Sequence, residues 1–100
     1  MSKEEKPVAS DIEQMIEFAH GGIVSKTFVE TDRVKLVLFC MEAGQELSEH
    51  TASVPAIIHV LRGKAALILG GQKYDAGPGR LYYMPVNLPH AIKAHEDFVM

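Results

Sequence analysis

The sequence predicts an all-β fold, a small antiparallel β-barrel or jelly roll with one short helix at its N-terminal end. Two observations support this prediction. From Ile23 onward the chain is a series of short runs rich in Val, Ile, Leu and Phe, separated by turns that contain Gly and Pro. Helical periodicity occurs only before Gly21. Many short strands at close spacing favour a closed antiparallel barrel.

The length and composition fit a single globular domain. The chain has 100 residues, of which 47% are hydrophobic, and this is enough apolar material to bury a core. Met1–Lys6 is polar and lacks the apolar centre of a signal peptide. We therefore expect residues 1–9 to form a flexible tail and residues 10–100 to form one barrel domain.

The helix is expected over Asp11–His20. Ser10 and Glu13 have the spacing of a capping box, in which each side chain bonds to the backbone N–H of the other residue. Apolar residues recur at helical spacing up to Ala19, and Gly21-Gly22 is a typical end of a helix. The alternative is an irregular arm that lies over the barrel.

The strand expected over Val34–Met41 follows one over Ile23–Glu30 and is apolar on both faces. Residues 34, 36, 38 and 40 lie on one face, and residues 37, 39 and 41 lie on the other. One face can fill a barrel interior. The other needs a cover from a second sheet, the N-terminal segment or a partner subunit. We therefore predict a homodimer, in which the Ile23–Val29 strand can join the sheet of the partner.

Further strands follow at short intervals. We expect them at Ala56–Arg62, Ala65–Leu69, Gln72–Tyr74, Arg80–Met84, His90–Ala94 and Phe98–Met100. Gly70-Gly71 is a typical two-residue hairpin loop. The polar stretch Glu46–Glu49 is expected to be a solvated loop.

The charge and the cysteine content limit which binding partners and which cellular compartment are expected. The net charge is −3 and the Lys and Arg residues do not cluster, so neither nucleic acid nor a membrane surface is an expected partner. No apolar run approaches the roughly 20 residues that span a bilayer. The single cysteine, Cys40, lies in an apolar run and is expected to be a buried, reduced thiol. This favours a reducing compartment, and we expect a cytoplasmic protein.

Two histidines, forty residues apart, stand in matching sequence contexts. The first follows a glycine with five residues between them, and the second follows a glycine and a proline that are also separated by five residues. These positions match the two motifs of the cupin superfamily, and the chain resembles a small single-domain cupin of the type-2 conserved barrel. The matching residues are Gly44, His50, Gly63, Gly79, Pro85 and His90.

The first of these motifs is degenerate. Ala52 stands where family members have a second histidine, and Ala56 stands where they have a glutamate. In the second motif Asn87 replaces a glycine and Ala94 replaces an asparagine. Two positions that usually complete the family's metal site therefore provide no donor atom.

The resemblance implies that His50 and His90 point into the barrel and bind a divalent metal ion, namely Zn, Mn, Fe, Ni or Cu. Possible third ligands are His59, His95 and Glu49. Strand alternation argues against His59, because residues 56, 58 and 60 share the inward face, although a bulge would reverse this parity. His95 and Glu49 also point outward if their strands are regular.

The cavity beside the metal is expected to bind a small organic ligand. Candidate lining residues are Tyr82, Met84, Ile58 and Ile92. The family implies metal-assisted oxygenase, isomerase or decarboxylase chemistry on a small organic acid. The alternative is a non-catalytic module that binds or senses a small molecule and has lost its metal, and a third possibility is a structural dimer module without a ligand. Metal analysis of the purified protein discriminates between the first two.

Overall fold

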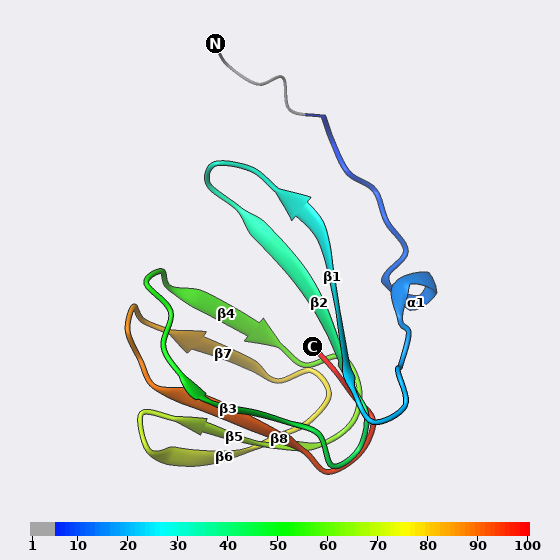
Figure 1. Cartoon of the computed structure of the whole chain (residues 1–100). Helices are drawn as coiled ribbons and strands as arrows, with labels where there is room; N and C mark the ends of the chain where they lie inside the picture. Colours follow the sequence, from blue (N-terminus) through cyan, green and yellow to red (C-terminus); the bar gives the residue numbers. More distant parts are fainter. Residues whose placement is uncertain (1–5) are drawn as a thin grey trace.

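The structure is a computed structural model that describes residues 6–100. In this range it contains helix α1 and strands β1 to β9 (Figure 1). Their bounds are α1 Ile12–Met15, β1 Ile23–Glu30, β2 Lys35–Met41, β3 Glu46–His50, β4 Ala56–His59, β5 Ala65–Leu69, β6 Gln72–Ala76, β7 Leu81–Met84, β8 His90–Ala94 and β9 Phe98–Val99. The expected tail of residues 1–9 lies partly outside the described residues, at positions 1–5.

The strands form three antiparallel groups around one core. β3, β8, β5 and β6 form a four-stranded sheet in that order, β1, β2 and β9 form a second sheet, and β4 pairs with β7. Figure 1 shows the four-stranded sheet at the bottom, β4 and β7 above it, and the β1–β2 hairpin extending upward. The expected all-β jelly roll with a short N-terminal helix is confirmed.

Both faces of β2 are covered at its C-terminal end, whereas Lys35 and Leu36 at its start are exposed. Met41 packs in the barrel interior, together with Leu67 of β5 and Phe98 of β9. Leu38 and the free thiol of Cys40 are buried on the opposite face. Three apolar side chains of the N-terminal segment cover that opposite face, namely Ile12, Met15 and Ile16. The N-terminal segment therefore provides the cover that an apolar two-faced strand needs.

The helix is shorter than the sequence predicts. Its N-cap is Asp11 rather than Ser10, and the Asp11 carboxylate accepts a hydrogen bond from the N–H of Glu13 at 3.0 Å. At Ile16 the backbone is already extended, with a ψ of 125°. A single turn depends on packing against the sheet more than on helix propensity, so the prediction of a helix up to His20 is wrong. No helix among residues 6–100 is long and apolar enough to cross a membrane.

Ion pairs attach this N-terminal segment to the barrel. The Glu17 carboxylate lies 2.8 Å from Nζ of Lys26 in β1. Its hydrogen bond to Lys26, together with the charge of that ammonium group, holds the pKa of Glu17 below its ordinary value. Glu13 pairs in the same way with Arg62, which follows β4. The segment is thus held at two points along the sheet as well as by its apolar side chains.

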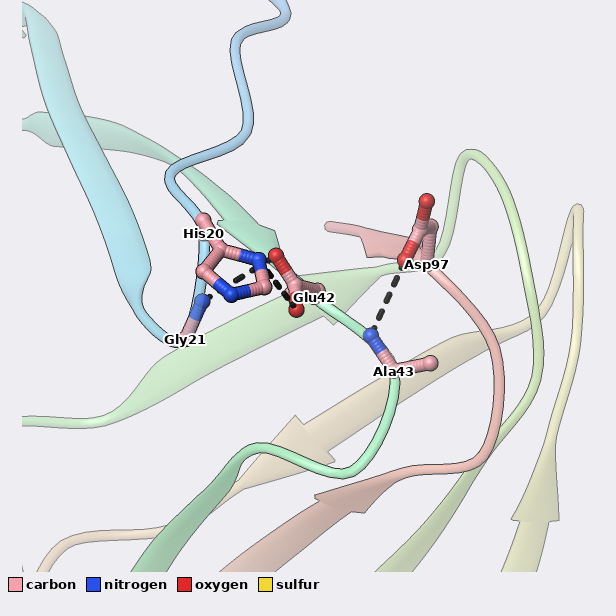
Figure 2. Close-up of polar contacts among 5 residues, drawn as sticks. All are labelled: His20, Gly21, Glu42, Ala43 and Asp97. Atoms are coloured by element: carbon pink, nitrogen blue, oxygen red, sulfur yellow. Dashed lines mark hydrogen bonds and ion pairs between the residues drawn. The ribbon is translucent and has the colours of Figure 1, made fainter.

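Two carboxylates join loops at one end of the barrel (Figure 2). Glu42, directly after β2, accepts a hydrogen bond from the N–H of Gly21 at 3.1 Å and lies 3.6 Å from Nδ1 of His20. Asp97, just before β9, accepts a hydrogen bond from the N–H of Ala43 at 2.9 Å. The turn before β1 and the turn before β9 are therefore both tied to the end of β2.

The stretch Glu46–Glu49 is part of a strand, so the prediction of a solvated loop is wrong. This segment lies in β3 and pairs with β8, with Glu46 opposite Lys93 and Leu47 opposite Ile92. Opposite charges directly across an antiparallel pair stabilise it. The single apolar residue, Leu47, packs against the core. One inward side chain is enough to orient an edge strand whose other face meets water.

We predict that Gly63→Ala destabilises the fold far more than Gly71→Ala does. Both glycines have positive φ, +79° and +84°, so an added Cβ strains the backbone in each case. At Gly63 the Cβ would also collide with the backbone carbonyl of Asp97, whereas it meets nothing within 4 Å at Gly71. We expect a loss of about 1–2 kcal/mol for Gly71→Ala and of more than about 3 kcal/mol for Gly63→Ala. Denaturant unfolding measures both, and equal losses would contradict the steric argument.

Candidate metal centre

A cavity of about 530 Å³ opens between β2 and β4 and extends into the barrel. Its inner part is bounded by the four-stranded sheet on one side and by β4 and β7 on the other. The side chains there are apolar except for two imidazoles. They are Leu47, His50, Ala56, Ile58, Met84, His90 and Ile92.

His50 and His90 lie directly across from one another on paired strands. His50 ends β3 and His90 begins β8, and the two residues are register partners. Their ring centroids are 4.1 Å apart and the rings meet edge to face, at 60°. The structure therefore brings together the two histidines that the sequence singles out, and both line the same cavity.

A β-bulge produces this alignment. Leu47 pairs with Ile92, yet the next pair along the ladder joins His50 to His90, so β3 uses one residue more than β8 over this interval. Without the bulge, Glu49 would stand opposite His90. The extra residue therefore selects which side chain of β3 lies beside His90.

Both imidazoles are oriented by the same backbone contact. Nδ1 of His50 lies 2.8 Å from the carbonyl oxygen of Ser48, and Nδ1 of His90 lies 2.8 Å from the carbonyl oxygen of Leu88. A carbonyl oxygen only accepts, so Nδ1 is the protonated donor in each neutral ring. Nε2 then carries the lone pair, and this is the arrangement in which histidine binds a metal while its other nitrogen is held by a backbone carbonyl.

The two rings differ in their exposure to solvent. His90 is 7% exposed and is the only polar or charged residue buried in the described part of the chain. His50 is exposed. No buried side-chain nitrogen or oxygen among residues 6–100 lacks a hydrogen-bond partner, so Nε2 of His90 is not sealed inside the protein. One imidazole therefore belongs to the wall of the cavity and the other to its mouth.

The remaining sequence candidates separate into two groups. Ile58, Met84 and Ile92 line the cavity, whereas Tyr82 does not. Tyr82 packs against the core, and its ring stacks edge to face on Tyr74 with centroids 5.7 Å apart. Tyr82 and Met84 share the inward face of β7 by alternation, but Tyr82 lies two residues further from the histidines along that strand.

No third donor joins the histidine pair among residues 6–100: no group of three or more His, Cys, Asp or Glu side chains there could hold a metal ion. His59 is exposed while its neighbour Ile58 is buried, as strand alternation predicts. It borders the outer part of the cavity. Glu49 and His95 are exposed too.

Sequence reasoning missed Leu47 as a lining residue because its segment was taken for a loop. Ala56 also lines the cavity, at the position where the family pattern has a glutamate. Ala56 lies opposite Met84 on the β4–β7 pair. The wall that faces the two histidines therefore presents methyl and thioether groups instead of a carboxylate.

Two imidazoles, one in the wall and one at the mouth of an apolar cavity, define a class: small antiparallel barrel proteins with a candidate metal and ligand site. Residues 37–100 match the family model for the cupin domain, and the chain belongs to that family. No curated protein matches the chain.

Solved structures agree with this assignment. A cupin superfamily protein from Desulfitobacterium hafniense is 26% identical, with a TM-score of 0.84 over 98% of this chain and 88% of that one. A conserved protein of unknown function from Streptococcus pyogenes is 27% identical, with a TM-score of 0.83 over 97% and 85%. Salicylate 1,2-dioxygenase from Pseudaminobacter salicylatoxidans is 16% identical, with a TM-score of 0.71 over 79% of this chain and 25% of that one, and it shares the fold alone.

We predict that the neutral forms of His50 and His90 are both the Nδ1–H tautomer, because each Nδ1 must donate to a carbonyl oxygen. Long-range ¹H–¹⁵N spectra of the metal-free protein measure this. The exposed His59 serves as an internal reference and should show a mixture of tautomers. A dominant Nε2–H form at either of the paired histidines would contradict the proposed orientation.

Proposed function

We propose that this protein binds a divalent metal ion through Nε2 of His50 and Nε2 of His90, together with a small organic ligand in the apolar cavity. The observation that carries the proposal is the matched pair of Nδ1 contacts to backbone carbonyls. Those contacts leave two lone pairs on neighbouring rings. Two imidazoles oriented in this way suit Zn, Mn, Fe, Ni or Cu.

The number of protein donors determines what the ligand must supply. Two imidazoles leave at least two positions open on a four-coordinate ion, whereas a catalytic zinc usually keeps three protein ligands. The ligand is therefore expected to contribute donor atoms itself, for example the carboxylate of a small organic acid. Its remaining part is expected to be apolar, because Ile58, Met84 and Ile92 face the same space.

When bound, a metal ion at this position supplies a Lewis acid or a centre for dioxygen, the chemistry that oxygenases, isomerases and decarboxylases use. The residues of the chain would have three roles near a bound metal ion. The carbonyls of Ser48 and Leu88 keep both rings in one tautomer. The apolar wall excludes water and strengthens electrostatic interactions inside the cavity. The exposed edge of His50 leaves a path for the ligand.

The alternative function is a non-catalytic barrel that binds or senses a small molecule without a metal. One observation favours it: Ala56, at the family's glutamate position, faces the cavity and offers no donor atom. In this case the two imidazoles would bind the ligand through hydrogen bonds. Metal content discriminates between the two functions.

We also propose that the protein forms a homodimer. The outer face of the β4–β7 pair carries three large apolar side chains that are strongly exposed, Ile57 at 65%, Leu81 at 64% and Tyr83 at 64%. A contiguous apolar surface of this kind is typical of an interface between subunits. Light scattering at high micromolar concentration measures the mass, and a monomer there would contradict the proposal.

The buried free thiol of Cys40 suits a reducing compartment, and we propose a cytoplasmic location.

We predict that His50→Ala and His90→Ala each abolish stoichiometric metal binding, because a site with two protein donors cannot spare one. His59→Ala is the matched control and should retain the metal, since His59 faces outward. The measurement is metal content by mass spectrometry on protein purified without a histidine tag. Each sample is reloaded in turn with Zn, Mn, Fe, Ni and Cu. Full metal content in both His50→Ala and His90→Ala would contradict the site, and no metal in the unmodified protein would favour the non-catalytic alternative.

A variant that should bind metal more tightly can be tested in the same metal-binding assay. Ala56→Glu places a carboxylate on the wall that faces the two imidazoles. We expect the metal affinity to rise about tenfold or more, since even partners that only support a ligand contribute about 10- to 100-fold. Leu81→Glu adds the same charge to the outward face of the neighbouring strand β7, at a residue that does not line the cavity, and should leave the affinity unchanged.

A further inference from the structure

A second cavity, of about 490 Å³, lies at one end of the four-stranded sheet, where Lys64 leads into β5. No residue that lines it also lines the histidine cavity. Three of its side chains are basic, namely Lys64, Arg80 and His95, and one is a carboxylate, Asp75. The three basic residues are far apart in the sequence and are brought together by the fold. We call this cavity the Lys64 hollow.

The pairing of β5 with β8 places Lys64 beside His95. Ala65 pairs with Ala94, and the N–H of His95 donates to the carbonyl oxygen of Lys64 at 2.9 Å. Ala65 and Ala94 are both 1% exposed and pack in the core, so the neighbouring residue on each strand points to the outer face of the sheet. Cβ atoms at such paired positions lie about 5 Å apart. The two basic side chains therefore leave the sheet side by side.

A glycine leaves open space on the other side of Lys64. Ala65 also pairs with Ala76 of β6, and the same register brings Gly77 next to Lys64. A Cβ added at Gly77 would meet no atom within 4 Å. The chain then turns, and the N–H of Arg80 donates to the carbonyl oxygen of Gly77 at 3.1 Å. Because position 77 has no side chain, a hollow remains that Lys64 and Arg80 both border.

The basic side chains of the hollow are not engaged with other groups in the described part of the chain. Among residues 6–100, no carboxylate lies within 4 Å of a side-chain nitrogen of Lys64, Arg80 or His95. None of these three side chains takes part in a hydrogen bond there. Glu96 follows His95 in the sequence but does not line the hollow. The cations that border the hollow therefore outnumber its one carboxylate, that of Asp75.

We propose that the Lys64 hollow binds the phosphate group of a small molecule. Lys64 carries a compact ammonium group, and Arg80 offers a planar fork of N–H donors; both are common phosphate-binding side chains. His95 donates through one ring nitrogen even when it is neutral. The donors come from three segments of the chain, so they approach one space from different directions, as the oxygens of a tetrahedral anion require. The hollow lies apart from His50 and His90, and the proposal does not depend on metal binding.

The test uses the metal-free full chain, labelled with ¹⁵N and titrated with inorganic phosphate and with methyl phosphate at constant ionic strength. Metal is removed because an ion held by the histidines would itself attract phosphate. We expect saturable one-to-one shifts centred on the amides of Lys64, Gly77, Arg80 and His95, with a Kd on the order of 1 mM. Acetate has one charge and two oxygens, and we expect it to bind at least about tenfold more weakly.

The two phosphates distinguish between possible occupants. The residues that border the hollow are exposed, so a substituent on one phosphate oxygen has room to extend into solvent. Methyl phosphate is therefore expected to bind as tightly as inorganic phosphate. A preference for inorganic phosphate of more than about tenfold would overturn the assignment to a phosphorylated molecule, because the occupant would then be the free ion.

Charge variants have a matched control. Lys64→Gln and Arg80→Gln each remove one charged donor, and we expect each to weaken phosphate binding about three- to fivefold, as for other exposed charge pairs. Asp75→Asn removes the one like charge and should strengthen binding by a similar factor. Lys73→Gln is the control, because Lys73 is an exposed lysine of β6 that does not border the hollow. It should leave the affinity unchanged.

A shape variant separates the hollow from a general effect of charge. Gly77→Val keeps every charge and adds a side chain where a Cβ meets nothing within 4 Å. The φ of Gly77 lies outside the left-handed region, so a side chain is tolerated there. We expect an unchanged midpoint of thermal unfolding and loss of saturable phosphate binding.

Four results would overturn the proposal: no saturable shifts, acetate binding as tightly as phosphate, equal weakening by Lys73→Gln, and full affinity in Gly77→Val. The second and third would mean that any anion is attracted to the positive charges of this surface. None of the variants alters His50 or His90, and metal is absent throughout. Failure of the phosphate site is therefore distinguishable from failure of the proposed metal site.

Discussion

The bulge between Leu47 and His50 is the constraint on which the candidate site depends. It adds one residue to β3 and so brings His50, instead of Glu49, opposite His90. The other side of β8 is held by β5, where Leu67 pairs with Ile92 and the register continues to the pair Leu69 and His90. Because a slip of one residue turns every side chain to the other face, this backbone pairing determines which groups enter the cavity.

The two imidazoles share one wall, and this shapes the chemistry of the cavity. His50 and His90 come from adjacent strands of the four-stranded sheet, while the facing wall contributes Ala56, Ile58 and Met84. Polarity is therefore concentrated on one side. A ligand with a polar group at one end and an apolar body would fit this division, because its polar group would lie beside the imidazoles and its carbon atoms would be buried against the other wall.

Much of this arrangement could be predicted from the sequence, where periodicity and spacing carry the information. The alternation of Ile58 and His59 correctly placed one inside and one outside, and the spacing of glycines around His50 and His90 indicated the barrel. Helix length could not be predicted, because apolar spacing over Ile12–Ile16 fits either a continued helix or one turn followed by an extended arm. Only packing against Leu38 and Cys40 decides between them. The strand at Glu46–Glu49 was missed because its partner Lys93 is remote in sequence, and charge pairing across strands leaves no local pattern.

The cavity opens between β2 and β4, and its two imidazoles are unequally accessible from outside. His50 is exposed, whereas His90 is 7% exposed. Both rings are nevertheless held by the same contact, from Nδ1 to the carbonyl oxygen two residues before each histidine. A polar group that enters the cavity from the side of His50 would therefore meet that ring before the buried one, and would meet the same nitrogen, Nε2, on each.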